Sequence, residues 1–130
     1  MNIGTAAERS GVPAKTIRYY EEIGLIPGAR RSEGGYRVYL ENDVQTLRFI
    51  QRARSLGFSV KEVAALLALW RDKGRASAEV KAMAQSHIAD IEKKIAELES
   101  MRRTLLDLTH RCHGDDHPDC PILEELADGR

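Results

Sequence analysis

Apolar residues recur at steps of three and four over residues 76–108, a segment without glycine or proline. This spacing is typical of one apolar stripe on a helix whose other faces are polar. Such a helix extends for roughly 50 Å at 1.5 Å per residue. A short chain cannot bury so long a stripe, so we expect it to pack on a second copy rather than in the core of a monomer. The stripe comprises Val80, Ala84, Ile88, Ile91, Ile95, Leu98, Met101, Leu105 and Leu108.

The N-terminal region has the pattern of two short helices joined by a tight turn. Asn2 can cap the first helix, and Gly11 follows its end. A second helix is predicted over residues 13–23, because proline is suited to a first turn and Gly24 can form the C-terminal cap. This is the helix-turn-helix pattern, which by itself is a weak signal.

The second helix carries side chains that are suited to nucleic acid. Ile17, Tyr20 and residues 23–25 are predicted to face inward. Cationic groups on the outer face can reach phosphates or base edges, and a tyrosine hydroxyl can donate to a phosphate. An ordinary solvated face would carry similar residues. The candidate contacts are Lys15, Thr16, Arg18 and Tyr19.

Residues 28–39 have the pattern of a projecting β-hairpin. Two short extended runs flank Ser32–Gly35, and Gly34 and Gly35 are predicted to supply the positive φ of its turn. Basic residues interleaved with aromatic ones suit a wing that lies along a phosphate backbone. A plain surface hairpin is the alternative, although three arginines within eight residues are unusual for one. The candidate contacts are Arg31, Gly35, Tyr36 and Arg37, and Arg30 is the third arginine.

Two more helices are predicted before the long one. The third covers about residues 41–56 and is followed by Gly57. The fourth begins at Ser59, which forms a capping box with Glu62, and ends near Trp70. Two basic residues, Arg54 and Lys61, lie near the junction of these helices.

Charge is distributed unevenly along a chain whose formal net charge is zero. Residues 1–75 contain 13 Lys and Arg against 8 Asp and Glu, whereas residues 76–130 contain 7 against 12. A basic part beside an acidic part indicates that the first part binds a polyanion. There is no apolar run of signal-peptide type and nothing near the ~20 apolar residues of a membrane span. We therefore expect a cytoplasmic protein without membrane contact.

Both cysteines and three of the four histidines follow the long helix. Cys112 and Cys120 are eight residues apart, and Gly114 and Pro118 allow the intervening loop to fold back. A last short helix is predicted over residues 121–127. The three histidines are His110, His113 and His117.

Four interpretations of this loop compete. A disulfide is disfavoured in a reducing cytosol, and the cysteines can also be two unrelated structural residues. A Cys2His2 zinc site is chemically possible, but the spacing is not that of a zinc finger. The favoured interpretation is a two-thiolate site for a soft monovalent ion, because thiolates select Cu(I). The zinc ligands would be Cys112, His113, His117 and Cys120.

The sequence Ile17-Arg-Tyr-Tyr-Glu-Glu-Ile-Gly-Leu-Ile-Pro, followed by Arg31-Ser-Glu-Gly-Gly-Tyr-Arg-Val-Tyr, resembles the winged-helix head of the MerR family of transcription regulators. The resemblance covers the whole chain and implies a mainly α fold. It implies a winged helix-turn-helix DNA-binding region over residues 1–75, a dimerisation helix over 76–108, and a metal-binding loop with a terminal helix over 109–130. Members of the family form homodimers through an antiparallel coiled coil. The effector-bound dimer bends and untwists promoter DNA, which aligns the promoter for RNA polymerase. By resemblance, Arg54 and Lys61 add phosphate contacts.

The loop pattern Cys112…Gly-Asp-Asp…Asp-Cys-Pro-Ile is similar to the copper-efflux (CueR-like) branch of this family. In that branch the two cysteines bind one Cu(I) per subunit, with Ag(I) or Au(I) as substitutes. Relatives that sense divalent ions have a further cysteine at the start of the long helix, where this chain has Ser77. The missing thiolate implies a preference for singly charged ions, and Lys81, one turn further, can offset the charge of the dithiolate or be simply solvated.

No nucleophile–base constellation or phosphate-binding glycine loop is present, so an enzyme is not expected. Two alternatives stay open. One is a Zn(II)-responsive regulator of the same family, in which His113 or His117 would ligate the metal. The other is a copper carrier, against which salt-sensitive binding to a palindromic duplex would decide.

Overall fold

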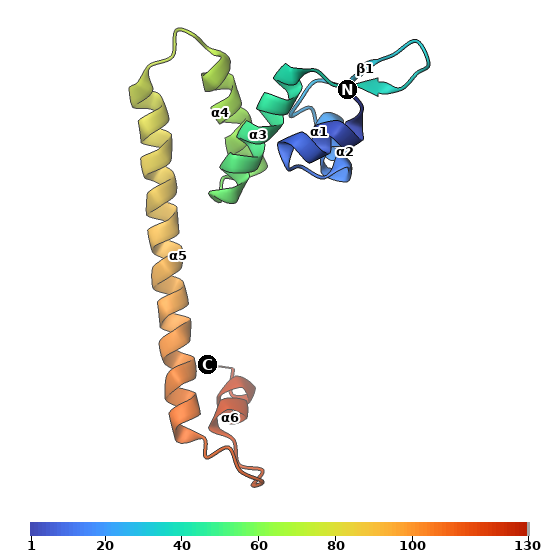
Figure 1. Ribbon diagram of the computed structural model, residues 1–130. Coiled ribbons are helices and arrows are strands. Elements are labelled where there is room, and N and C mark those ends of the chain that lie inside the picture. Colours follow the sequence, from blue (N-terminus) through green and yellow to red (C-terminus); the bar gives the residue numbers. More distant parts are fainter. Residues whose placement is uncertain (130) are drawn as a thin grey trace. The chain divides into compact units, whose positions relative to one another are not determined.

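The computed structural model describes residues 1–129, which contain six helices and one small antiparallel sheet (Figure 1). The chain forms two compact units, one from Met1 to Val80 and one from Lys81 onward. The elements are α1 (Ile3–Ser10), α2 (Ala14–Glu22), β1 (Arg30–Arg31), β2 (Arg37–Val38), α3 (Glu41–Ser55), α4 (Val60–Arg71), α5 (Ser77–Arg111) and α6 (Pro121–Ala127).

Local capping determines where the first helices begin and end. The Asn2 side chain accepts a hydrogen bond from the Thr5 amide at 2.8 Å, which confirms the predicted cap of α1. Gly11 has a left-handed φ of 77° at the end of α1, and Gly24 has a φ of 78° just after α2. Pro13 caps α2 instead of forming its first residue.

The first unit has one apolar core, which the first four helices share. Helix α1 packs on α2 and α3, and α4 packs on α3. Full burial of one aliphatic side chain stabilises the folded state by roughly 1.5–3 kcal/mol. The buried side chains of this core therefore hold the four helices together. Ile23 was predicted to face inward and is 43% exposed instead, because at about 3.6 residues per turn it lies on a different side of the helix from Ile17. The largest fully buried side chains are Val12, Ile17, Val44, Leu47, Ile50 and Val63.

The predicted hairpin projects from these helices (Figure 1). Its strands pair Arg30 with Val38 and Arg31 with Arg37. Gly35 has the expected positive φ of 80°, but the prediction of a positive φ for Gly34 was wrong. A Cβ at Gly34 would lie 3.2 Å from the Tyr36 ring, so the ring would have to shift slightly to make room for it.

The junction between α3 and α4 has the predicted capping box. The Ser59 amide donates to Glu62 Oε1 at 2.9 Å, and the Glu62 amide donates to Ser59 Oγ at 3.1 Å. Gly57 precedes this cap with a φ of 91°. Helix α3 ends one residue earlier than predicted, at Ser55, and α4 ends one residue later, at Arg71.

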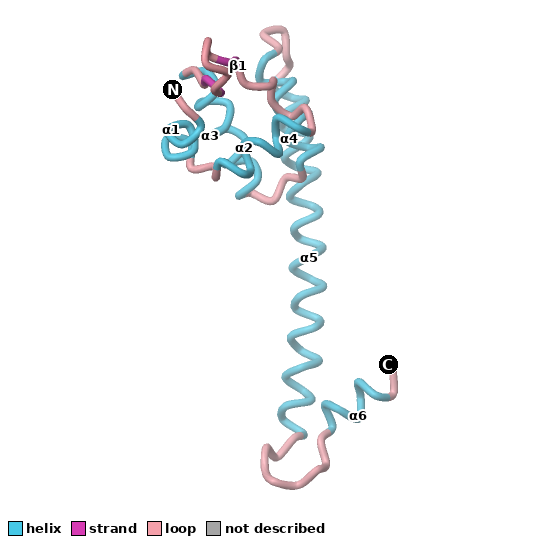
Figure 2. Tube along the Cα trace, turned by 90° about the vertical axis from the view of Figure 1, so that its right-hand side faces the viewer, coloured by secondary structure: helices cyan, strands magenta, loops and turns pink. Residues whose placement is uncertain are grey.

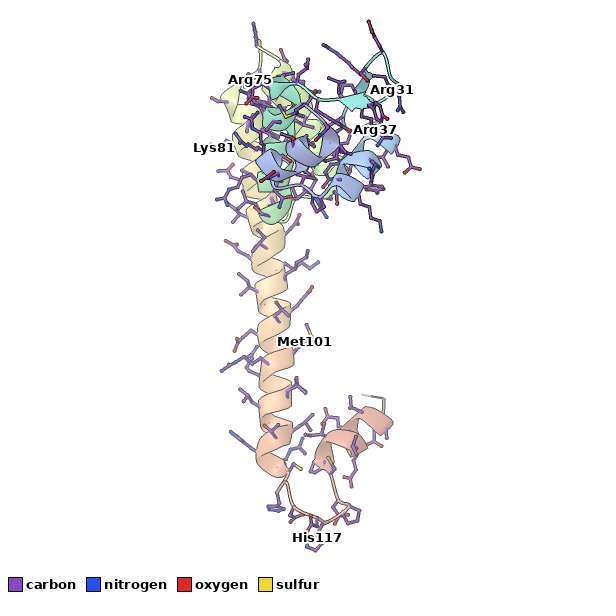
Figure 3. All side chains as sticks on the ribbon, turned by 45° about the vertical axis from the view of Figure 1, so that its right-hand side comes forward. Arg31, Arg37, Arg75, Lys81, Met101 and His117 are labelled. Atoms are coloured by element: carbon purple, nitrogen blue, oxygen red, sulfur yellow. The ribbon has the colours of Figure 1, made fainter. Side chains whose placement is uncertain are left out.

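Helix α5 continues three residues beyond the predicted end and stops directly before Cys112. Within this single chain its apolar stripe is open to solvent: Ile95 is 59% exposed and Leu98 is 61% exposed. Met101 projects from the side of the helix (Figure 3). Along α5 only Leu108 is buried, at 3% exposure. None of the helices described over residues 1–129 has the length and apolar character of a membrane span.

A loop connects α5 to α6, and α6 turns back beside the end of α5 (Figures 1 and 2). Helix α6 covers Pro121–Ala127, as predicted, with Cys120 as its N-cap residue.

Candidate nucleic-acid interface and metal-binding loop

Helix α2 separates an inner face from an outer face as predicted. Ile17 is fully buried and Tyr20 is 6% exposed, which orients the helix on the core. The opposite face is therefore available to a partner. Lys15, Arg18 and Tyr19 are exposed on it, and Thr16 is half-buried.

The hairpin is held in shape by its own hydrogen bonds. Arg31 Nη1 donates to the Gly35 carbonyl at 3.0 Å, and the Tyr36 amide donates to Ser32 Oγ at 3.2 Å. The Tyr36 side chain is 77% exposed at this tip. Gly35 thus acts through its backbone, as the turn residue and as the acceptor for Arg31.

Three of the predicted contact residues gather where α2 meets the hairpin. Two adjacent hollows, of about 390 and 340 Å³, are both lined by Arg18, Arg31 and Arg37. Arg31 and Arg37 come from the two strands, and Figure 3 labels both on the hairpin. Because guanidinium groups bind phosphate oxygens in a bidentate manner, this arginine cluster is suited to a nucleic-acid backbone.

A buried carboxylate beneath the arginine cluster was missed at the sequence level. The Glu21 side chain is 8% exposed, and its Oε2 lies 3.7 Å from Arg37 Nε. Its Oε1 accepts a 2.5 Å hydrogen bond from the Tyr39 hydroxyl. Burial and this bond to Glu21 raise the pKa of Tyr39 to about 12. Glu21 therefore anchors the base of the hairpin to α2. Its partners are far away in sequence, so no local pattern revealed it.

A second ion pair, also not predicted, connects α1 with α3. The Arg9 guanidinium donates two hydrogen bonds to the Glu41 carboxylate. This bonding holds the pKa of Glu41 below its usual value. Arg48 Nε donates to the Arg9 carbonyl at 3.0 Å, which adds a second connection between the two helices.

The two basic residues at the α3–α4 junction have different surroundings. Arg54 Nη1 donates to the Phe58 carbonyl at 2.7 Å, so one part of this side chain braces the junction. Lys61 is exposed in the first turn of α4. Both side chains lie in the first unit together with the arginine cluster.

The two cysteines occupy the two ends of one loop. Both are free thiols and both are half-buried. The Cys112 amide donates to the Thr109 carbonyl at 3.2 Å, directly after α5. The Cys120 carbonyl accepts from the Glu124 amide at 3.0 Å, which begins α6. The backbone is therefore held by α5 just before Cys112 and by α6 just after Cys120.

The residues between the cysteines are exposed to solvent. Gly114 has a φ of 65°, and the His117 amide donates to Asp115 Oδ1 at 2.9 Å. His117 lies at the tip of the loop (Figure 3), and the His113 side chain is also exposed. Over residues 1–129, no group of three or more His, Cys, Asp or Glu side chains is arranged to hold a metal ion. The Cys2His2 set is not brought together.

The start and the end of α5 carry the remaining candidate residues. Ser77 is the first residue of α5, and Lys81 lies one turn further; both are exposed. At the other end, Arg111 Nη2 lies 3.1 Å from Asp107 Oδ2 and 3.4 Å from Glu125 Oε2 on α6.

Known proteins match this chain over nearly its whole length. The family described as "MerR HTH family regulatory protein" matches residues 1–70, and the one described as "MerR, DNA binding" matches residues 44–108. Heavy metal-dependent transcription regulator 2 of Rhizobium meliloti (strain 1021) is 61% identical over 129 residues, which cover 99% of this chain and 88% of that protein. The HTH-type transcriptional regulator CueR of Salmonella typhimurium is 43% identical over 127 residues, which cover 98% and 92%. The crystal structure of PbrR691 from Ralstonia metallidurans CH34 in complex with lead(II) has a TM-score of 0.83 and 36% identity, and covers 97% of this chain and 98% of that one.

Proposed function

The chain belongs to the MerR family of transcriptional regulators, and we propose that it activates promoters in response to Cu(I), with Ag(I) or Au(I) as substitutes. One ion per subunit would bind Cys112 and Cys120, and the genes switched on would serve copper efflux. The observation that carries this proposal is the position of two free thiols at the two ends of one short loop. The family regulates transcription and is not a family of enzymes.

The arginine cluster supports binding to promoter DNA. Arg18, Arg31 and Arg37 line two hollows, and Tyr36 lines one of them. Lys15 and Tyr19 are exposed on α2. Deforming a promoter site costs on the order of 1–6 kcal/mol, so many phosphate contacts are needed to hold the distorted form. The DNA would contain two half-sites one helical turn (~34 Å) apart, and each would bind one DNA-binding unit of the dimer. The dimer would act on RNA polymerase indirectly, by distorting the promoter DNA.

The exposed stripe on α5 supports a homodimer. Ile88, Ile95, Leu98 and Leu105 are each more than half exposed in the single chain. Monomeric proteins rarely leave a contiguous apolar stripe of this length in water. An antiparallel pairing of two α5 helices would cover it, and would bring the loop of one protomer toward the start of α5 of the other.

The chemistry of the ligands supports a monovalent ion. Two thiolates satisfy Cu(I), Ag(I) or Au(I), which accept two ligands in a line. Ser77 offers a hydroxyl where a third thiolate would favour divalent ions, and Lys81 would offset the charge of the dithiolate. A Zn(II) site would need His113 and His117, and both are exposed. The names of the relatives, which refer to heavy metals and to lead(II), are compatible with a metal effector.

Metal binding would act by closing the loop. Drawing Cys112 and Cys120 together moves the start of α6, and the new position of α6 against the partner would rotate the two DNA-binding heads. Switching a two-state dimer from 1:99 to 99:1 requires a preference of about 5.5 kcal/mol for one state. Two metal–thiolate bonds in each of two subunits can supply a preference of this size.

An operator-bending assay with and without Cu(I) tests the proposal. The wild type should bend the DNA and activate transcription only with metal, and Cys112→Ser should bind the operator without responding to metal. His117→Ala, at the tip of the same loop, is the matched control and should respond like the wild type. Bending by Cys112→Ser equal to that of the wild type would exclude the loop as the sensor. A copper carrier would show no salt-sensitive binding to a palindromic duplex.

A further inference from the structure

We propose that Arg111 and Glu125 form an ion-pair clamp that holds the ends of the cysteine loop near each other before metal draws the two thiols together. The inference rests on the proposed metal-sensing function and assigns these two residues a positioning role. Arg111 directly precedes Cys112, and Glu125 lies on α6 beyond Cys120. Their ion pair therefore closes a ring of the chain that contains both thiols.

The geometry places the clamp at the base of the loop. Arg111 Nη2 and Glu125 Oε2 are 3.4 Å apart, and they join the last residue of α5 to the middle of α6. Leu108, one turn before Cys112, is buried in the single chain, at 3% exposure. The Glu125 side chain is 35% exposed, so the pair lies at the surface but is not fully solvated.

The clamp would raise metal affinity through preorganisation. A two-thiolate site must bring two separated groups of the chain together, and closing a flexible loop costs conformational entropy. A contact that already holds the loop ends near each other lowers that cost at the moment of binding. Because exposed ion pairs contribute modestly, the expected gain is about two- to fivefold in Kd.

Asp107 allows the clamp to be distinguished from a role of Arg111 within α5 alone. It lies one turn back on α5, and its Oδ2 is 3.1 Å from the same Arg111 nitrogen. Arg111 is therefore shared between Asp107 and Glu125. If the clamp is correct, removing the Asp107 charge leaves metal affinity unchanged or raises it. If Arg111 only stabilises the last turn of α5, Asp107→Asn weakens metal binding as much as Arg111→Gln does.

Cu(I) titration of the reduced full-length protein against a competing chelator tests the clamp. Arg111→Gln and Glu125→Gln should each weaken Kd about two- to fivefold, and the double variant should weaken it no further. The exchanged pair Arg111→Glu with Glu125→Arg should regain part of the loss. Arg102→Gln removes a similar ion pair with Glu99 earlier on α5 and should bind like the wild type. Unchanged affinity in both single variants, or losses that simply add, would overturn the proposal.

A metal-free measurement separates this inference from the proposed function. In glutathione redox buffers, the equilibrium between the two thiols and a Cys112–Cys120 disulfide reports the effective concentration of one thiol at the other. Arg111→Gln should lower that concentration about two- to fivefold at low salt, and the difference should vanish at an ionic strength of roughly 1 M, where the Debye length is about 3 Å. An equal effective concentration in both proteins would refute the clamp. Failure of Cys112→Ser to change Cu(I) binding would instead refute the proposed function.

Discussion

The Tyr39 hydroxyl donates a 2.5 Å hydrogen bond to the Glu21 carboxylate, and this bond connects the residue after β2 to α2. Arg37, on β2 itself, approaches the same carboxylate at 3.7 Å. One buried acid thus fixes both the hairpin and the helix that carries Lys15, Arg18 and Tyr19. The positions of the two groups of candidate DNA contacts depend on each other through Glu21.

We predict that Tyr39→Phe destabilises the protein at neutral pH by about 1–3 kcal/mol, because it leaves a buried acceptor without its donor. Urea unfolding measures this loss. The pKa of Tyr39 is about 12 in the folded protein, above the ordinary value of 10.0. The stabilisation is therefore fully present below about pH 10 and is lost as the pH rises toward 12.

The difference in stability between wild type and Tyr39→Phe should accordingly shrink between pH 10 and 12. Tyr36→Phe removes a hydroxyl from the exposed hairpin tip and serves as the control, with stability near that of the wild type. A difference that stays constant across this range would show that the Tyr39 hydroxyl is not held by Glu21.

Arg31→Gln should weaken binding to the operator and to unrelated duplexes by similar factors, because a phosphate contact carries no sequence information. The slope of log K against log salt is negative, and its magnitude should decrease by about 0.9 for one lost phosphate contact. Fluorescence anisotropy at several salt concentrations gives both values. Arg102→Gln, on α5, should leave the slope unchanged; an unchanged slope for Arg31→Gln would remove Arg31 from the interface.

Leu98→Glu should convert the protein to monomers, because it places a charge in the middle of the exposed apolar stripe of α5. Analytical ultracentrifugation gives the mass directly. Gln85→Glu adds a charge to α5 beside the stripe and should leave a dimer. If Leu98→Glu sediments with the mass of the wild type, another surface must hold the protomers together.

The sequence predicted those features of the fold that depend on neighbouring residues. Asn2, the Ser59–Glu62 box and Pro121 each act within one helical turn, and each begins its helix as expected. The prediction ended α5 three residues too early, at Leu108. Residues 109–111 contain no helix breaker, so the helix continues to the residue before Cys112. Leu108 marked where the apolar stripe ends, but the stripe could not show where the backbone hydrogen bonds of the helix end.

Contacts between residues that are far apart in sequence were beyond local patterns. The joining of Glu21 to Tyr39 and of Arg9 to Glu41 follows from the packing of the first unit. The sequence grouped Arg18, Arg31 and Arg37 as candidate contacts, and the structure assembles them around shared hollows. The roles of Cys112, Cys120, Ser77 and Lys81 in metal binding stay predictions.

X-ray absorption spectroscopy of the reduced protein loaded with one Cu(I) per subunit tests the central claim most directly. A two-cysteine site predicts two sulfur neighbours and no nitrogen neighbour, with the same spectrum in a variant that combines His113→Ala and His117→Ala. Imidazole nitrogens in the copper coordination sphere of the wild type, lost in that variant, would contradict the account.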